Sequence, residues 1–210
     1  MPSAAPRTYA ICDLFHSLQG EGAWSGRAMV FVRFSGCPLA CPWCDEPKHR
    51  DPALAEQVTV EELSQRIQAL APLCRNLLLT GGEPLAVANL QTFIDHFKQA
   101  GYWIAMESSG VGGPVPEGLD WLTLSPKTAL DEELLMRANE LKFIGGTDMS
   151  DAQWSRIEAL GAQHPLVWLQ PRAIGDKPDP AAARACIQRI QSSSGNVRLS
   201  IQSHKYLGIQ

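Results

Sequence analysis

Three cysteines stand close together in one short segment of the chain, Cys37, Cys41 and Cys44. A cubane iron–sulfur cluster has four irons and is normally held by four cysteine thiolates. The other cysteines are scattered along the chain, so three local thiolates without an obvious fourth partner would leave one iron open to an external ligand. The spacing therefore predicts a cluster whose open iron position takes part in chemistry.

Two plainer interpretations of these cysteines carry less weight. A structural zinc ion needs four closed ligands, usually in two spaced pairs, and here only His49 could complete a local set. Disulfides are less favoured still, because the N-terminus lacks the apolar segment of a signal peptide and six cysteines in a chain of this length fit a reducing compartment. We therefore expect a cytoplasmic protein, with Cys12, Cys74 and Cys186 as buried structural thiols.

Composition limits the other possibilities. The chain has 210 residues, is 45% hydrophobic and 19% charged, and carries a formal net charge of -4. This length suits one substantial core, so we expect a single domain over 1–210, with 1–8 flexible. The scattered basic residues give no footprint for nucleic acid, and no apolar run approaches the length that spans a membrane. Partners of these two kinds are therefore not expected.

The elements that must position the cysteines alternate between strands and helices. Short β-rich runs are expected at 29–34, 76–80, 103–107, 121–125, 140–144, 166–170 and 197–201. A capping box at 59–62 opens a helix that places Leu63, Ile67 and Leu70 on one face. Apolar residues between 90 and 97 recur at helical spacing, further helices are expected over 131–138, 151–160 and 180–191, and loops over 112–116 and 175–180. The four remaining histidines, His16, His49, His96 and His164, are expected on the surface or on helices.

This alternation predicts an α/β fold of mainly parallel strands. Because a complete eight-fold barrel needs roughly 250 residues, an open, partial TIM-like barrel fits better. Polar clusters follow the predicted strands at 80–84, 107–110, 125–127, 170–172 and 202–205. The carboxyl ends of parallel strands meet on one face, which is where such sheets hold their active sites, and the cysteine loop opens onto the same face. The pair Gly81-Gly82 is the most specific of these signals, because two residues without side chains let a ligand approach the backbone, although a simple turn explains it equally well by itself.

The cysteine spacing, with Trp43 before the last cysteine, and the Gly-Gly-Glu-Pro run at 81–84 resemble the radical S-adenosylmethionine (SAM) superfamily. Within that superfamily the chain resembles the family of enzymes that form 7-carboxy-7-deazaguanine. The segments that carry this second resemblance are 18–22, 31–37, 107–110, 125–127 and 204–209. The resemblance extends over nearly the whole chain, leaving out only the first few residues, and it implies an open barrel of the radical SAM type.

The resemblance implies the cofactors. In this superfamily the methionyl amino and carboxylate groups of SAM chelate the open iron, and one electron from the cluster cleaves SAM into methionine and a 5'-deoxyadenosyl radical. Cys37, Cys41 and Cys44 would hold a 4Fe–4S cluster. Ser125 and Gln170 could bond the ribose hydroxyls, and Lys127 could face a carboxylate. The residues implied for the SAM site are Trp43, Cys44, Asp45, Gly82, Ser125, Pro126, Lys127, Gln170, Pro171, Arg172 and Ala173.

The resemblance also implies a substrate, 6-carboxy-5,6,7,8-tetrahydropterin, which has an amide-like edge and a carboxylate. Gln19 and Glu21 would read the edge. Arg33, always charged and able to bind in a bidentate way, would clamp the carboxylate. The residues implied for the substrate site are Leu18, Gln19, Gly20, Glu21, Arg33, Thr80, Glu107, His204 and Gln210, the last through the C-terminal carboxylate.

The implied reaction begins with hydrogen abstraction from C6 of the pterin. Ring contraction and loss of ammonia then give 7-carboxy-7-deazaguanine for deazapurine nucleosides such as queuosine, and SAM is restored. Magnesium assists in the family by coordinating the substrate carboxylate, but Glu46 replaces the usual threonine here. Its oxygen donors suit Mg²⁺, so the ion could bind more tightly, shift, or give way to a contact from Lys48. A flavodoxin or ferredoxin electron donor and a homodimer are implied as partners.

Two other functions remain possible at this point. A radical SAM activase, which installs a glycyl radical on a partner protein, shares the cysteine spacing but leaves the polar loop at 19–22 without a ligand. A non-catalytic iron–sulfur or zinc module would show no response of its metal centre to SAM. The enzyme that contracts the pterin ring is the interpretation that uses every motif.

Overall fold

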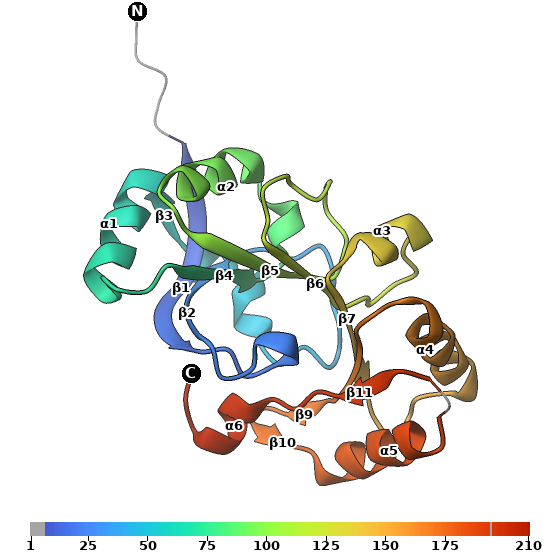
Figure 1. The fold of residues 1–210 in the computed structure, drawn as a ribbon. Helices are drawn as coiled ribbons and strands as arrows, with labels where there is room; N and C mark the ends of the chain where they lie inside the picture. Colours follow the sequence, from blue (N-terminus) through green and yellow to red (C-terminus); the bar gives the residue numbers. More distant parts are fainter. Residues whose placement is uncertain (1–6, 194) are drawn as a thin grey trace, which may run out of the picture. The chain divides into compact units, whose positions relative to one another are not determined.

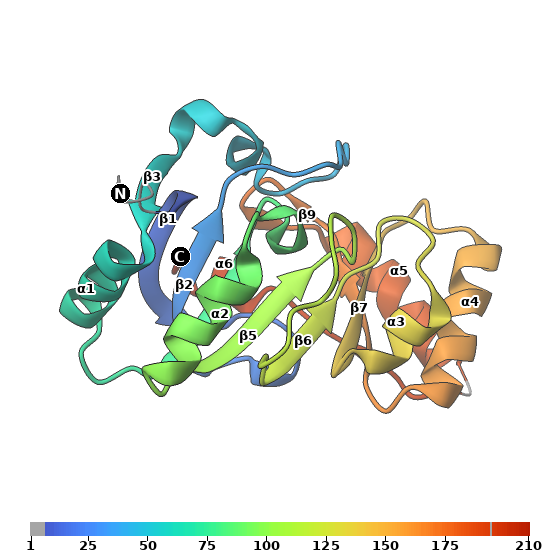
Figure 2. The ribbon, with the colours of Figure 1, turned by 90° about the horizontal axis from the view of Figure 1, so that it is seen from above.

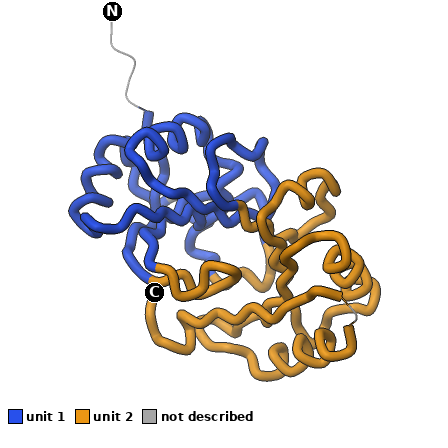
Figure 3. The backbone as a smooth tube through the Cα atoms, in the orientation of Figure 1, with its two compact units in different colours: residues 1–17, 28–40, 46–121 blue, residues 18–27, 41–45, 122–210 orange. Residues whose placement is uncertain are grey.

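The computed structural model describes residues 7–193 and 195–210. Residues 1–6 of the segment expected to be flexible lie outside the described residues, whereas Thr8 begins the first strand. The chain divides into two compact units (Figure 3). Unit 1 comprises residues 1–17, 28–40 and 46–121, and unit 2 comprises residues 18–27, 41–45 and 122–210.

The strands of unit 1 are mainly parallel. They lie side by side in the order β5-β4-β2-β1-β3, in which β2, β4 and β5 run parallel and β1 pairs antiparallel with β3. Their sequences are near-continuous apolar runs at the centre, as expected of strands covered on both faces, and Val30, Leu77 and Ile104 are fully buried. The strand bounds are β1 Thr8–Leu18, β2 Ala28–Phe34, β3 Glu56–Thr59, β4 Asn76–Gly81 and β5 Trp103–Ser108.

The helices of unit 1 begin and pack as their sequences predict. In α1 (Val60–Leu70) the Thr59 side chain accepts a bond from the Glu62 amide and the Glu62 carboxylate accepts one from the Thr59 amide, which is the predicted capping box. Leu70 lies in the last turn and remains 44% exposed. α2 (Leu90–Gln99) buries its apolar stripe and runs beside β5, while α1 contacts β3 and α2 (Figure 2). Short 3-10 turns complete the unit: η2 Pro47–Arg50, η3 Pro52–Leu54 and η4 Pro84–Ala86.

Unit 2 repeats the alternation of strand and helix (Figure 1). Four of its strands lie in the order β6-β7-β8-β11, and these four are parallel wherever a register is defined, whereas β9 and β10 form a separate antiparallel pair. α5 packs on β7, β8 and β11, and α4 packs on β8 and β11. The bounds are η1 Gly22–Trp24, β6 Trp121–Leu124, α3 Glu132–Arg137, β7 Glu140–Gly145, α4 Asp151–Gln163, β8 Val167–Pro171, β9 Ala173–Ile174, β10 Lys177–Pro178, α5 Pro180–Gln191, β11 Val197–Leu199 and α6 Ser203–Leu207.

Several elements were not predicted from the sequence. β1 buries Tyr9, Ile11 and Phe15 at alternate positions, but polar residues such as Asp13 break the apolar pattern that would have revealed it. β3 is a four-residue strand that exists because β1 offers it an edge. The predicted loop at 175–180 contains β10, which pairs antiparallel with β9. Very short strands of this kind depend on their partner, so their own sequence carries little signal.

Two histidines and two cysteines are not where the sequence alone would place them on the surface or in the core. His49 and His164 are buried, at 1% and 2% exposure, although His49 lies in the 3-10 turn η2 and His164 directly follows α4. His164 Nδ1 accepts a bond from the Leu166 amide at 3.1 Å, and Nε2 lies 3.0 Å from the Ala138 carbonyl, so both ring nitrogens have partners inside the protein. All six cysteines are free thiols, and Cys186 is buried as predicted, but Cys12 and Cys74 are only half-buried. No helix in the described part of the chain is long and apolar enough to cross a membrane.

Candidate active site

The cysteine loop begins where β2 ends. Cys37 belongs to unit 1, whereas Cys41 and Cys44 belong to unit 2, and all three thiols are half-buried. The Cys44 amide donates to the Cys41 carbonyl at 3.2 Å, which turns the chain between those two thiols. Within residues 7–193 and 195–210, no group of three His, Cys, Asp or Glu side chains stands ready to hold a metal ion by itself. Cluster ligation by these three cysteines therefore stays a prediction.

The Gly81-Gly82 pair allows two segments of backbone in unit 1 to approach each other closely. The Gly82 amide donates to the Phe34 carbonyl and the Glu83 amide to the Gly36 carbonyl, both at 2.8 Å. A Cβ atom on Gly82 would lie 1.9 Å from the Gly36 carbonyl oxygen, and one on Gly81 would lie 2.3 Å from the Phe34 oxygen. The absent side chains thus allow contact with the chain's own backbone, in a place where the glycine pair had been expected to admit a ligand. Contact of Gly82 with SAM stays a prediction.

Glu83 holds the end of β5 to this glycine turn, a role that the sequence argument did not assign. Its carboxylate is 2% exposed and accepts bonds from Ser108 Oγ at 2.5 Å and from the amides of Ser109 and Leu85 at 2.8 and 3.0 Å. The Ser109 hydroxyl also donates to it. The sequence signal that could have revealed this contact is an acid at the end of one predicted strand and two serines at the end of the next. Glu107, the predicted substrate residue beside them, is half-buried.

Arg33 and Thr80 are brought together by the sheet. They are direct partners in the register of β2 and β4, and adjacent residues at the same level of parallel strands project to the same face. Both are half-buried, and the Arg33 guanidinium lies 5.3 Å from the centre of the Phe15 ring. An arginine supported in this way keeps its charge and its fork geometry for an anion.

The 18–22 loop of unit 2 is shaped by its own side chains. Gln19 is 7% exposed, and its Oε1 accepts bonds from the amides of Gly20 at 2.7 Å and Glu21 at 3.2 Å. Leu18 is 39% exposed. The carbonyl of the Gln19 side chain is thus engaged within the loop, and contact of Gln19 with the substrate edge stays a prediction. Gln19 therefore holds the shape of the segment that presents Glu21.

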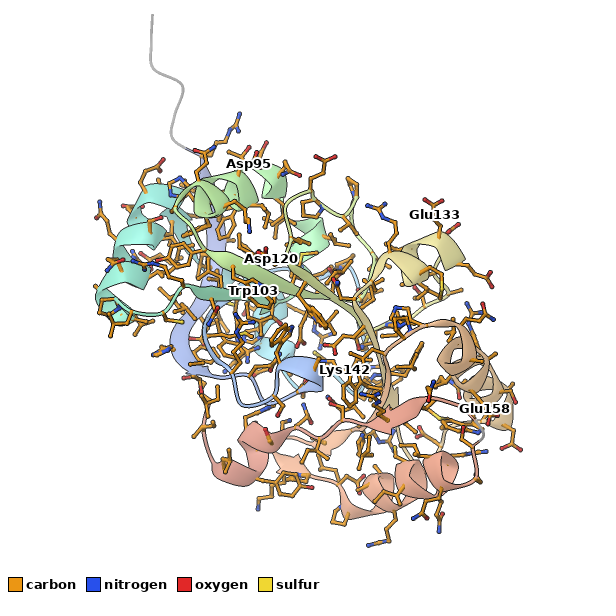
Figure 4. The ribbon with its side chains drawn as sticks, viewed as in Figure 1. Asp95, Trp103, Asp120, Glu133, Lys142 and Glu158 are labelled. Atoms are coloured by element: carbon orange, nitrogen blue, oxygen red, sulfur yellow. The ribbon has the colours of Figure 1, made fainter. Side chains whose placement is uncertain are left out.

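Glu21 forms a buried ion pair with Lys142 on β7. Figure 4 labels Lys142. Burial raises the pKa of Glu21, but the charge of Lys142 and hydrogen bonds from Lys142, Gln202 and Gln170 outweigh it and lower the pKa to about 2. Glu21 is therefore an anion at any physiological pH. Sequence reasoning missed Lys142, whose position in a predicted strand gave no sign that it lies beside a residue 121 positions away.

A second buried acid, Glu140 at the start of β7, fixes the turn that follows Glu21. It accepts bonds from the Ala23 amide at 2.9 Å, Thr123 Oγ1 at 2.7 Å and Trp168 Nε1 at 2.6 Å. The Gly22 amide donates to Ser200 Oγ at 3.1 Å. Glu140 was not singled out from the sequence either.

Most of the residues predicted for the SAM site belong to unit 2. Lys127 donates to the Ser125 carbonyl at 2.9 Å and to its hydroxyl at 2.5 Å. Burial lowers the pKa of Lys127, and the nearby charge of Lys142 lowers it further. Gln170 is buried and accepts from Ser200 Oγ at 2.8 Å, and Arg172 pairs with Asp148 at 3.0 Å. Pro126 follows Ser125, Pro171 ends β8, Ala173 begins β9, and Trp43 is 45% exposed.

The C-terminal segment is anchored on the loops that precede it in unit 2. Gln202 Nε2 donates to Glu21 Oε1 at 2.8 Å and to Asp45 Oδ2 at 3.0 Å. Lys205 Nζ lies 3.5 Å from Asp45 Oδ2. The predicted substrate residue His204 packs directly against Gly20, whereas the predicted C-terminal residue Gln210 is exposed.

Replacing Gly20 with alanine is expected to separate the C-terminal helix from the 18–22 loop. The new Cβ would lie 2.1 Å from His204 Nδ1 and 2.9 Å from the His204 backbone amide. Overpacking of this kind costs about 1–3 kcal/mol, and we expect the free energy of unfolding to fall by that amount. Denaturant unfolding of the apoprotein measures it, and Gly20→Ala combined with His204→Ala, which removes the ring, should recover part of the loss. Unchanged stability of the single variant would contradict the predicted clash.

Glu46, the predicted magnesium ligand in unit 1, is paired with two neighbours. Its Oε2 lies 3.5 Å from Lys48 Nζ and 3.6 Å from His49 Nε2. The backbone of His49 is fixed through its carbonyl, which accepts from the Gly36 amide at 2.9 Å. The segment after the cysteines thus folds back onto the residue before Cys37.

Comparisons with known proteins give the class. Residues 31–161 match the family model described as the Radical SAM superfamily, which is more than half of the chain. This protein is therefore a radical SAM enzyme, and that class works with a 4Fe–4S cluster and SAM.

The relatives give the family within that class. The chain is 37% identical over 207 residues to the 7-carboxy-7-deazaguanine synthase of Synechocystis sp., covering 97% of this chain and 94% of the relative. It is 31% identical over 228 residues to the synthase of Escherichia coli K12, covering 96% and 99%. The crystal structure of QueE from Escherichia coli matches with a TM-score of 0.75 at 28% identity, covering 94% of this chain and 95% of that one. The chain belongs to the 7-carboxy-7-deazaguanine synthase family, and the predicted fold class, an open α/β barrel of the radical SAM type with mainly parallel strands, is confirmed.

Proposed function

We propose that this chain converts 6-carboxy-5,6,7,8-tetrahydropterin into 7-carboxy-7-deazaguanine with loss of ammonia, a step toward deazapurine nucleosides such as queuosine. The observation that carries the proposal is the Glu21 carboxylate, buried and held as an anion on a glycine-containing loop. Such a carboxylate accepts hydrogen bonds from N–H donors, and the amide-like edge of a pterin carries them. The family supplies the reaction class, and Glu21 supports the choice of substrate.

We assign the 4Fe–4S cluster to Cys37, Cys41 and Cys44, because three half-buried free thiols are the donor type that such clusters need. When bound, the cluster supplies the electron that cleaves SAM and starts the radical chemistry. Lys127, half-buried and bonded to Ser125, is proposed to face a carboxylate of SAM. The other predicted SAM residues keep their assignments, from Trp43 to Asp45 and from Gln170 to Ala173.

The substrate residues divide by chemistry. Arg33, with Thr80 beside it, is proposed to bind the pterin carboxylate, and Glu21 the opposite edge. His204 is proposed to close the site from the C-terminal segment, with Glu107 and the carboxylate of Gln210 as further contacts. These groups hold the ring in one orientation and exclude water while the radical carbon reacts.

We further propose that magnesium binds near Glu46. A carboxylate is a suitable oxygen ligand for Mg²⁺, and Lys48 and His49 would have to yield part of their contact with it. From the family we also propose a flavodoxin or ferredoxin electron donor, a homodimer, and the two units acting together as one domain. Six free thiols support a reducing location such as the cytoplasm.

The test is an anaerobic assay of the cluster-reconstituted protein with the pterin, SAM, magnesium and dithionite. We expect 7-carboxy-7-deazaguanine by absorbance and mass, with SAM recovered unchanged. Cleavage of SAM without that product would show that the pterin is not the substrate. A pterin left untouched would also contradict the proposal, and it is the result expected of an enzyme that activates a partner protein. Omitting magnesium should lower the rate, and an equal rate in a chelator would remove magnesium from the proposal.

A further inference from the structure

We propose that Lys142 and Gln202 are positioning residues for Glu21: Lys142 holds the carboxylate as an anion, and Gln202 ties it to Asp45, which follows the last cluster cysteine. The inference rests on the proposed function, because it takes Glu21 to be the group that meets the substrate edge. It adds two residues that do not themselves contact SAM or substrate.

Both side chains of the ion pair are largely shielded from solvent. The side chains of Lys142 and Glu21 are 3% and 13% exposed, and the Lys142 ammonium donates to Glu21 Oε2. A buried ion pair carries a large desolvation cost, so it is weak support for stability alone. Removing one partner, however, leaves a charge without compensation in a low-dielectric site. The arrangement is therefore suited to fixing the charge and direction of Glu21.

Gln202 gives the second constraint. One amide nitrogen has two hydrogens, and Gln202 Nε2 lies within bonding distance of Glu21 Oε1 and of Asp45 Oδ2, at 2.8 and 3.0 Å. It stands next to α6, whose Ser203 also bonds the loop through its amide and hydroxyl, at 2.9 and 3.0 Å from the Gly20 carbonyl oxygen. The C-terminal segment thus links the loop of the proposed substrate site to the residue beside Cys44.

The charges around Glu21 come from several elements of unit 2. Lys142 lies on β7, Lys127 follows β6, and Asp45 lies beyond Gln202, while Glu140 holds the next turn through the Ala23 amide. Burial acts to raise the pKa of Glu21, and the charge of Lys142 is the foremost of the influences that lower it to about 2. Without Lys142 the effect of burial remains, and the carboxyl then takes up a proton at higher pH.

The experiment compares the pH profile of kcat/KM for the pterin in wild type and Lys142→Met, with reconstituted protein under anaerobic conditions. Wild type should show no acid limb from Glu21, whereas Lys142→Met should lose about tenfold in kcat/KM for each unit of pH below the new pKa. In Glu21→Gln with Lys142→Met, this acid limb should vanish because no carboxyl titrates. Lys205→Met removes a cation that lies 3.5 Å from Asp45, and it should not create the limb.

Gln202→Leu tests the second constraint without disturbing the ion pair. A hydrogen bond to a charged group is worth enough to raise KM about tenfold, with a smaller change in kcat. If Lys142→Met does not fold, this variant still decides the role of Gln202, and Lys142→Arg, which keeps the charge, should retain the wild-type profile. An unchanged KM in Gln202→Leu would overturn the role of Gln202, and a folded Lys142→Met without the new acid limb would overturn the role of Lys142.

Acid unfolding of the apoprotein separates this inference from the proposed function. In wild type the pKa of Glu21 is lowered from 4.5 to about 2, so its stabilisation is present above pH 4.5 and is lost as the pH falls toward 2. In Lys142→Met the pH-dependent stabilisation by Glu21 should be absent or reversed. The reference is the difference between Glu21→Gln and the double variant Glu21→Gln with Lys142→Met. If wild type fails to turn over the pterin yet this difference appears, the proposed function is wrong and the pairing is right. If wild type turns over the pterin and no difference appears, the pairing is wrong.

Discussion

Gly82→Ala is expected to reduce turnover at least about a hundredfold, because a displacement on the order of 1 Å in a positioned site costs that much. The new Cβ would lie 1.9 Å from the Gly36 carbonyl oxygen, 2.5 Å from its carbon and 3.0 Å from its nitrogen. These are backbone atoms, so no side chain can rotate away. The 81–83 segment must then move from 34–36, and Cys37 follows directly. We also expect stability to fall by about 1–3 kcal/mol.

The measurements are anaerobic turnover, iron content after reconstitution and thermal unfolding of the apoprotein. Gly195→Ala is the matched control, because the nearest atom to its Cβ lies 3.3 Å away, against 1.9 Å at Gly82, and the position is remote in the sequence from Cys37, Cys41 and Cys44. Wild-type turnover by Gly82→Ala would show that the close contact with Gly36 is not required.

Glu83→Ala is expected to lower the free energy of unfolding by about 3 kcal/mol or more, since each unsatisfied buried donor costs about 1–3 kcal/mol. The carboxylate accepts from two serines of the β5 end and from the Leu85 amide, and it is 2% exposed. Alanine would leave these donors without an acceptor in a place that bulk water does not reach. The 108–110 segment should then lose its fixed position, and activity should fall with it.

Glu83→Gln distinguishes shape from charge at this position. The amide keeps the size, but its NH₂ group faces donors, so we expect an intermediate loss of stability in denaturant unfolding. Glu132→Ala, an exposed acid in the first turn of α3, is the control and should change stability by less than about 1 kcal/mol. A Glu83→Ala protein as stable as this control would contradict the anchoring role.

Local sequence patterns were sufficient for much of the fold. The capping box of α1 and the apolar stripe of α2 involve residues three or four positions apart, so a short window contains the whole interaction. The central strands are long apolar runs whose burial follows from composition. β1 was missed because its alternation is interrupted, and α6 because five residues carry too little periodic signal.

The sequence by itself determined the class of chemistry, through the spacing of Cys37, Cys41 and Cys44 and the motifs that follow the strands. Tertiary structure alone decided which residues support that site. Lys142 meets Glu21 across 121 positions and Gln202 meets it across 181, and neither pairing leaves a trace in any local window. The physical reason is that charge and hydrogen-bond partners are set by which strands the topology places side by side, whereas spacing within a loop is set by the chain itself.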